Sequence, residues 1–330
     1  MVIPRYLLEK IQTAPPDGAW KAVFKHAWDI CSAPLTVASA SRKVIARDAA
    51  LADLDLVLSS SGWELWSDFE QSVEQTSKAL TDWWAARSTG KAVLILDGLS
   101  LRELPWILDG AKERGFQVSA RVTGAELPGD TTPFAKALGF GQRSDLENNR
   151  ASRTHRLQGA QTDCVDLPWV DCLDLVGLEP NWVLWHQWPD SRIHDFADPG
   201  KGLGTLATEA ASKLTSPEFW DLIDRLTLGR QLVITSDHGY AASGLFSDAP
   251  EEQAKHLKNV FRSGRSSDDV TSKSSWFPPI DLVLTSQHGQ KRFVLGRRKW
   301  KSAGGYPTLV HGGLSVLEMA SPFIELFKPE

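Results

Sequence analysis

The chain has few cysteines and no long apolar run, and both shortages narrow the class of protein. Its 330 residues include three cysteines, Cys31, Cys164 and Cys172, whose spacings form no disulfide framework. An odd number of widely spaced cysteines in a chain of this length predicts free thiols and a reducing compartment. No stretch approaches the roughly 20 apolar residues that a membrane-spanning helix requires. We therefore expect a cytoplasmic protein that has no contact with a membrane.

We also expect no secretory leader, and the sequence has no excess of basic charge. Charge and proline occur within the first residues, too early for the apolar core of a signal peptide. The formal net charge of −5 gives no overall basic field, so any contact with nucleic acid would depend on local basic residues. The hydrophobic fraction of 42% is ample for a large buried core. These values are typical of one large globular α/β domain, alone or with a smaller attachment.

The N-terminal quarter of the chain has helical periodicity and no convincing strand. Apolar residues recur at three- and four-residue spacing over residues 6–11, 22–28 and 62–87. Tryptophans in the last of these segments indicate that its apolar face packs against a large surface. We predict that residues 1–88 form a helical domain or cap and that residues 89–330 form an α/β domain.

Beyond residue 88, short apolar runs alternate with amphipathic segments. The runs predict buried strands and the segments predict helices, an order typical of α/β domains. Strands are expected at residues 92–96, 117–122, 182–185 and 230–236, with a hairpin at 281–296 that turns at His288 and Gly289. Helices are expected at residues 100–114, 134–138, 203–226, within 249–265 and at 315–327. A polar, serine-rich tract at residues 263–269 is expected to form a mobile flap.

Carboxylate and imidazole side chains follow several of the expected strands. Asp237 and His238 come directly after the strand at residues 230–236 and precede a glycine turn. Open α/β sheets hold their reactive groups at the carboxyl ends of the strands, and Asp and His suit zinc or manganese. Comparable positions hold Asp97, Asp190, His194 and His311, together with the hydroxyl of Thr131. Six potential ligands and a hydroxyl are what two metal ions would require for phosphoryl chemistry.

Taken in order, these motifs resemble the alkaline phosphatase superfamily and, within it, the PglZ domains of bacterial BREX-type phage-defence systems. They are Asp97-Gly98, Pro128 three residues before Thr131, Asp190-x-x-x-His194, Ser236-Asp237-His238-Gly239 and His311-Gly312-Gly313. The resemblance covers roughly residues 90–330 and leaves residues 1–88 out. It implies an alkaline-phosphatase-like sheet flanked by helices and two divalent ions. Zinc is favoured by the mixed ligands, and manganese accepts the same set.

The resemblance implies a role for each candidate residue. One ion would be bound by Asp97, Thr131, Asp237 and His238, and the other by Asp190, His194 and His311. Thr131 would be the nucleophile, at the start of a helix. Rival interpretations remain open: Thr132 as the nucleophile, His186 in place of His194, ordinary helix caps at Asp97, Asp130 or Thr131, and a backbone-bonded imidazole at His311.

Three functions are compatible with this pattern. The resemblance favours a metal-dependent phosphodiesterase or nuclease that acts on nucleic acid or nucleotides in phage defence, with other defence proteins as partners. Candidates for phosphate contacts are Arg262, Arg265, Arg297, Arg298 and Lys299, for which a solvated basic face is the more ordinary explanation. One alternative is a scaffold in a defence complex, with residues 1–88 as an interaction module. The other is a phosphomonoesterase, sulfatase or phosphomutase of the same superfamily.

Overall fold

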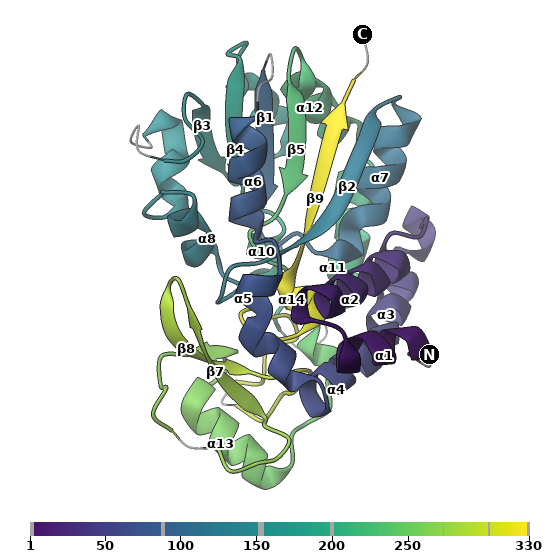
Figure 1. Ribbon diagram of the computed structural model, residues 1–330. Helices are drawn as coiled ribbons and strands as arrows, with labels where there is room; N and C mark the ends of the chain where they lie inside the picture. Colours follow the sequence, from purple (N-terminus) through teal and green to yellow (C-terminus); the bar gives the residue numbers. More distant parts are fainter. Residues whose placement is uncertain are drawn as a thin grey trace.

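A six-stranded mixed sheet forms the centre of the computed structural model, which describes residues 3–86, 90–150, 155–198, 201–272, 274–302 and 304–328 (Figure 1). The strands are β1 (Lys91–Leu96), β2 (Gln117–Gly124), β3 (Gln161–Val165), β4 (Asn181–His186), β5 (Gln231–Thr235) and β9 (Ala320–Phe327). Their order across the sheet is β2-β9-β5-β1-β4-β3. β1 is parallel to β4 and β5, β3 is parallel to β4, and β9 runs antiparallel to β2 and β5.

Helices cover both faces of this sheet because its central strands are apolar on both sides. Val93 and Ile95 of β1 share one hydrophobic cluster with residues of α6 (Thr76–Ala85) and α8 (Thr131–Ala137). Leu94 belongs to a larger cluster with residues of α7 (Leu104–Glu113), α11 (Leu203–Leu214) and α12 (Pro217–Thr227). Figure 1 shows α6 crossing one face of the sheet. The main helices around the sheet are α6 (Thr76–Ala85), α7 (Leu104–Glu113), α8 (Thr131–Ala137), α9 (Trp169–Leu175), α11 (Leu203–Leu214) and α12 (Pro217–Thr227). The predicted α/β class and helix-flanked sheet are confirmed.

The N-terminal region is helical, as predicted, and among the described residues before 87 it contains no strand. Its other helices are α1 (Arg5–Thr13), α2 (Pro16–Cys31), α3 (Ala40–Ala50), α4 (Ala52–Ser60) and α5 (Phe69–Ser72), with a 3-10 segment at Trp63–Asp68. Trp20 and Leu54 lie in the same hydrophobic cluster as Leu94 of the sheet, so these helices share its core. The boundary predicted at residue 88 lies outside the described residues, and the division into two domains stays a prediction.

The helix expected at residues 62–87 is interrupted in the structure. Val73 and Gln75 have extended backbone conformations, and Gln75 forms a bridge with Gly124 at the end of β2. The amide of Gly124 donates to the carbonyl of Glu74 at 2.9 Å. This pairing with the sheet interrupts the helix, because extended residues cannot continue the helical hydrogen-bond ladder.

The C-terminal segment predicted as a helix over residues 315–327 is a strand for most of its length. α14 (Val316–Met319) ends after one turn and β9 follows directly. Pro322 has no N–H to donate and its ring would clash with a preceding helical carbonyl, which stops the helix. Ile324 and Leu326 then enter one core and Phe323 the other, as alternating residues of a buried strand do.

A smaller sheet lies beyond the carboxyl ends of β1 and β5 in Figure 1. Its order is β6-β8-β7, with β6 (Ser266–Ser267), β7 (Asp281–Ser286) and β8 (Gly289–Val294), and α13 (Glu251–Phe261) packs beside it on a small core. The predicted hairpin is confirmed, although its turn consists of Gln287 and His288. The flap predicted at residues 263–269 is wrong at its centre, because Arg265 is buried and the next two residues form β6.

Buried ion pairs account for two of the arginines that the sequence offered for phosphate contacts. Arg265 pairs with Glu318 at 2.6 Å, and both side chains are fully buried. Arg297 pairs with Asp48 at 2.6 Å and with Asp55 at 2.7 Å, which joins the loop after β8 to α3 and α4. These guanidinium groups are satisfied inside the protein, so neither is available to a substrate.

No helix in the described part of the chain is long and apolar enough to cross a membrane.

Candidate metal centre

The residues predicted as ligands come together at the carboxyl ends of three parallel strands. Asp97 follows β1, and Asp237 and His238 follow β5. Asp190 is the first residue of α10 (Asp190–Asp195), which begins shortly after β4. His311 arrives on the loop before α14. Parallel neighbours end at the same edge of a sheet, and that register brings side chains far apart in the sequence to one place.

A first group consists of Asp97, Asp237 and His238, whose ligand atoms lie within 4.8 Å of one another. His238 Nε2 is 3.7 Å from Asp97 Oδ1 and 3.5 Å from Asp237 Oδ2, and all three side chains are fully buried. Asp237 Oδ1 accepts the amides of Gly98 and His238 at 2.9 and 3.0 Å, which directs Oδ2 toward the group. Thr131 Oγ1 donates to Asp97 Oδ1 at 3.3 Å, so its hydroxyl lies at the edge of this group.

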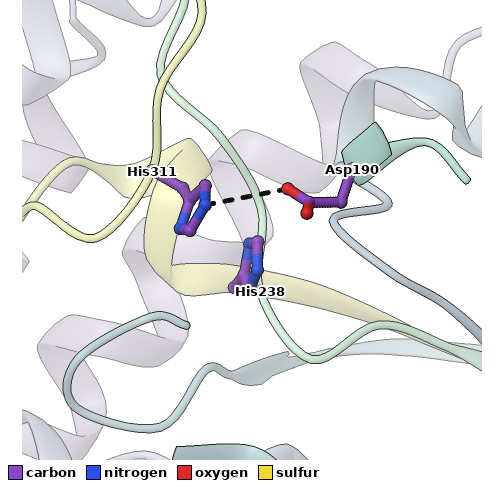
Figure 2. A group of neighbouring side chains, drawn as sticks. All are labelled: Asp190, His238 and His311. Atoms are coloured by element: carbon purple, nitrogen blue, oxygen red, sulfur yellow. Dashed lines mark ion pairs between the residues drawn. The ribbon is translucent and has the colours of Figure 1, made fainter. Parts of the chain in front are cut away.

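A second group consists of Asp190, His238 and His311, again within 4.8 Å of one another (Figure 2). His311 Nε2 is 3.7 Å from Asp190 Oδ1, and the rings of His238 and His311 are stacked with centroids 4.2 Å apart. His238 therefore belongs to both groups. The sequence-based assignment had placed it with the first ion alone.

His194 lies at the rim of the second group. Its Nε2 is 3.4 Å from Asp190 Oδ2 and its ring is 5.7 Å from that of His311, but its side chain is 66% exposed. The rival His186 points elsewhere: its Nε2 is 2.8 Å from the carbonyl of Leu167, and its Nδ1 accepts the amide of Trp188 at 3.0 Å. Both ring nitrogens of His186 are thus engaged, which favours His194 as the histidine of this group.

The structure also distinguishes between the rival assignments at the start of α8. Thr131 is half-buried and bonded to Asp97, whereas Thr132 is exposed. Asp130 stands at the N-cap position but makes no side-chain capping bond. Only the hydroxyl of Thr131, of these two threonines, is bonded to a member of the metal-ligand groups.

Unused polar atoms indicate that the two groups fit a cation. Asp190 Oδ1, Asp237 Oδ2 and His238 Nε2 are buried without a hydrogen-bond partner. His238 Nδ1 lies 2.9 Å from the carbonyl of Gly239 and His311 Nδ1 lies 3.2 Å from that of Gly129, so each Nδ1 carries the ring proton. In the neutral ring, each Nε2 then presents a lone pair toward carboxylate oxygens. Acceptors that face acceptors in a buried site are stable with a metal ion between them.

The charges of the site support the same conclusion. Burial, followed by repulsion from Asp237 and Asp190, holds the pKa of Asp97 well above its usual range. Burial opposes a charge on His238, yet the carboxylates of Asp237, Asp190 and Asp97 outweigh it and raise the pKa of His238 to about 9. Without a cation, protons on Asp97 and His238 balance part of this carboxylate charge. A metal ion would displace them, so metal affinity should fall as the pH is lowered.

Two residues that the sequence analysis did not single out contact Asp97. The guanidinium of Arg143 and the indole N–H of Trp185 both donate to Asp97 Oδ2, the second at 3.0 Å. Arg143 lies on the 3-10 segment Arg143–Asn149 and its side chain is 26% exposed. No motif marks Arg143, because it comes from a polar loop. Trp185 is the penultimate residue of β4, where only its position near a strand end is a signal.

The chain has a weak structural similarity to solved proteins. No protein-family model and no curated protein matches it. Two structures of murine ectonucleotide pyrophosphatase/phosphodiesterase 5 are similar. One, an inactive variant in complex with AMP, has a TM-score of 0.45 at 10% identity and covers 72% of this chain and 88% of that chain. The other has a TM-score of 0.43 at 12% identity and covers 73% and 88%. The residues of the site, and not these similarities, are therefore the basis for a function.

Proposed function

We propose that the chain is a metal-dependent phosphoester hydrolase that prefers phosphodiesters and uses Thr131 as its nucleophile. The observation that supports it is the pair of buried ligand groups that share His238 beside the Thr131 hydroxyl. Divalent ions bound there would polarise the phosphoryl oxygens and make the Thr131 hydroxyl more acidic. Zinc is the ion we favour, with manganese as the alternative.

Each residue of the site has a role in this proposal. One ion would be held by Asp97 and Asp237 and the other by Asp190 and His311, with His194 joining from the rim. His238 Nε2 lies within reach of both groups and, having a single lone pair, would bind one of the two ions. The bond from Thr131 Oγ1 to Asp97 holds the hydroxyl at the first group. Attack of Thr131 Oγ on phosphorus forms a threonyl phosphoester while the bond to the leaving alcohol breaks. Water then hydrolyses this ester and regenerates Thr131.

Arg143 has the position of a phosphate-binding residue. It donates to the same carboxylate as Thr131 and is partly open to solvent. A guanidinium can donate two parallel hydrogen bonds to a phosphate, so Arg143 would bind the phosphoryl oxygens that approach Thr131.

Substitution Arg143→Ala is expected to lower kcat/KM, measured at saturating metal, by about 10²-fold, the usual cost of removing one donor to a reacting oxyanion. Steady-state kinetics and metal analysis test this. The matched control is Arg150→Ala, an exposed residue of the same loop that pairs weakly with Glu147 at 3.8 Å. Equal kcat/KM in Arg143→Ala and the control would exclude a substrate contact.

A metal-depletion experiment tests the proposed function. The protein is stripped with a chelator, reloaded with zinc or manganese, and assayed with a chromogenic phosphodiester and the matching phosphomonoester. We expect hydrolysis only after reloading, with the diester cleaved faster. Turnover no greater than that of Thr131→Ala with every metal would refute the proposal. Metal equivalents separate it from the scaffold alternative, which predicts none.

The biological setting remains part of the proposal. A nucleic acid or nucleotide substrate, a place in bacterial phage defence beside other defence proteins, and a cytoplasmic location are supported by the motif resemblance and the sequence composition. The arginines left for contact with a polyanion are fewer than the sequence suggested, since Arg265 and Arg297 are in buried ion pairs.

A further inference from the structure

The short loop between β2 and α8, residues 125–130, connects to both ligand groups. The carbonyl of Gly129 accepts from Nδ1 of His311, and Thr131, directly after the loop, donates to Asp97. A shift of this loop would therefore move a histidine of the second group and the nucleophile at the same time.

A buried carboxylate, Glu126, stands at the start of the loop. Its side chain is fully buried and is surrounded by donors from two other parts of the chain. Ser77 Oγ of α6 donates to Oε1 at 2.5 Å, and Gln287 Nε2 donates to Oε2 at 2.8 Å. His288 Nε2 lies 3.8 Å from Oε2. The carboxylate therefore ties the loop to α6 and to the β7–β8 turn of the small sheet.

The β7–β8 turn makes further contacts beside Glu126. Ser286 Oγ donates to the carbonyl of Leu127 at 2.9 Å, and the amide of Gln287 donates to Glu70 Oε1 at 3.1 Å. The hairpin thus contacts two successive residues of the loop: the side chain of Glu126 and the backbone carbonyl of Leu127. Residues 287 and 288 take no part in the sheet pairing, so their side chains are free to serve this contact.

The far end of the loop has little room to absorb a displacement. A Cβ on Gly129 would lie 3.2 Å from Met319 Sδ and 3.4 Å from the carbonyl of Glu318. The loop backbone is therefore packed against α14 at Gly129. Because the loop is short and packed at this end, a change at Glu126 is transmitted to Gly129 and Thr131.

We propose that Glu126 is a positioning residue for the site and that the β7–β8 turn clamps it through Gln287. An ionised carboxylate only accepts hydrogen bonds, which suits the donors around it. Alanine in its place would remove the acceptor of both Ser77 and Gln287 and with it the bonds that tie the loop to α6 and to the turn. The loop would then be free to shift. The catalytic part of this inference rests on the proposed hydrolase function, but its effect on metal binding does not.

A pair of substitutions at Glu126 tests the clamp. Glu126→Ala removes both bonds and is expected to weaken metal binding and lower kcat, each by about tenfold or more, as the loss of outer-shell support commonly does. Glu126→Gln keeps both bonds, because its N–H₂ group can donate to Ser77 Oγ while its oxygen accepts from Gln287 Nε2, and both quantities should stay within about threefold of wild type.

The matched control is Gln290→Ala, an exposed residue of the same hairpin whose side chain bonds only to Thr285 at 3.4 Å. It should behave as wild type. Metal affinity is measured by calorimetric titration with zinc on the full chain, with thermal unfolding as a check of folding.

The outcomes distinguish the two proposals. Weaker metal binding in Glu126→Ala with binding close to wild type in Glu126→Gln supports the clamp, even if wild type hydrolyses no phosphodiester, in which case only the proposed function fails. Unchanged metal affinity and kcat in Glu126→Ala, or an equal loss in Glu126→Gln, would overturn the positioning role.

Discussion

Substitution His238→Ala is expected to remove one metal ion and to weaken the binding of the other, whereas His311→Ala affects the second group alone. His238 Nε2 has ligand atoms of both groups around it, while His311 belongs to the second group alone. Loss of an outer-shell partner already weakens metal binding by about 10- to 100-fold, so loss of a direct ligand should exceed that at the ion that His238 binds. Metal content after gel filtration and calorimetric titration with zinc give the number of equivalents.

Two further variants, Asp237→Ala and His311→Ala, each change a residue that belongs to one group alone. Asp237→Ala removes a charged ligand next to Thr131, so activity should vanish and excess metal should not restore it. His311→Ala removes a neutral ligand, and added zinc or manganese should partly restore activity. His186→Asn is the histidine control, because both ring nitrogens of His186 are bonded within the protein. It should keep both ions. Two ions bound at wild-type affinity by His238→Ala would show that His238 is not a metal ligand.

Thr131→Ala should abolish turnover while leaving metal binding intact. The side chain is half-buried and its hydroxyl makes one bond, to Asp97, so its removal leaves the core and the carboxylate ligands in place. Loss of a nucleophile should lower kcat by at least about 10³-fold. Steady-state hydrolysis of a phosphodiester and metal titration measure the two effects separately.

Two neighbouring substitutions sharpen this test. Thr131→Ser keeps a hydroxyl and should retain most of the activity. Thr132→Ala removes an exposed hydroxyl and should have little effect. Full loss in Thr132→Ala with activity retained in Thr131→Ala would exchange the two roles. Retention of activity in both would show that no threonine of α8 is the nucleophile.

Periodicity predicted the central strands because their residues are apolar on both faces. β1, β4 and β5 lie in the middle of the sheet, where an uninterrupted apolar run is the ordinary pattern. β3 was missed because it is an edge strand with a polar start, Gln161-Thr162-Asp163. β9 was mistaken for a helix because its short apolar run continues from a real helical turn. Its partners β2 and β5, which decide the matter, are distant in the sequence.

Sequence alone determined which chemical groups stand at the strand ends. An aspartate or histidine directly after a buried run is carried to the carboxyl edge of the sheet whatever the details of packing, and this predicted the places of Asp97, Asp237 and His238. The hydroxyl of Thr131 was predicted in the same way, from its place before a helix. These predictions depend on local order along the chain, which periodicity records.

Only the tertiary structure decided how these groups are shared. The place of His238 in both groups, the inward hydrogen bonds of His186 and the contact of Arg143 with Asp97 depend on distances between segments that are far apart in the sequence. The same holds for Arg265, which looked like a surface cation until Glu318 met it in the core. A side chain's partner is set by the packing of whole elements, and no local pattern in the sequence records that distance.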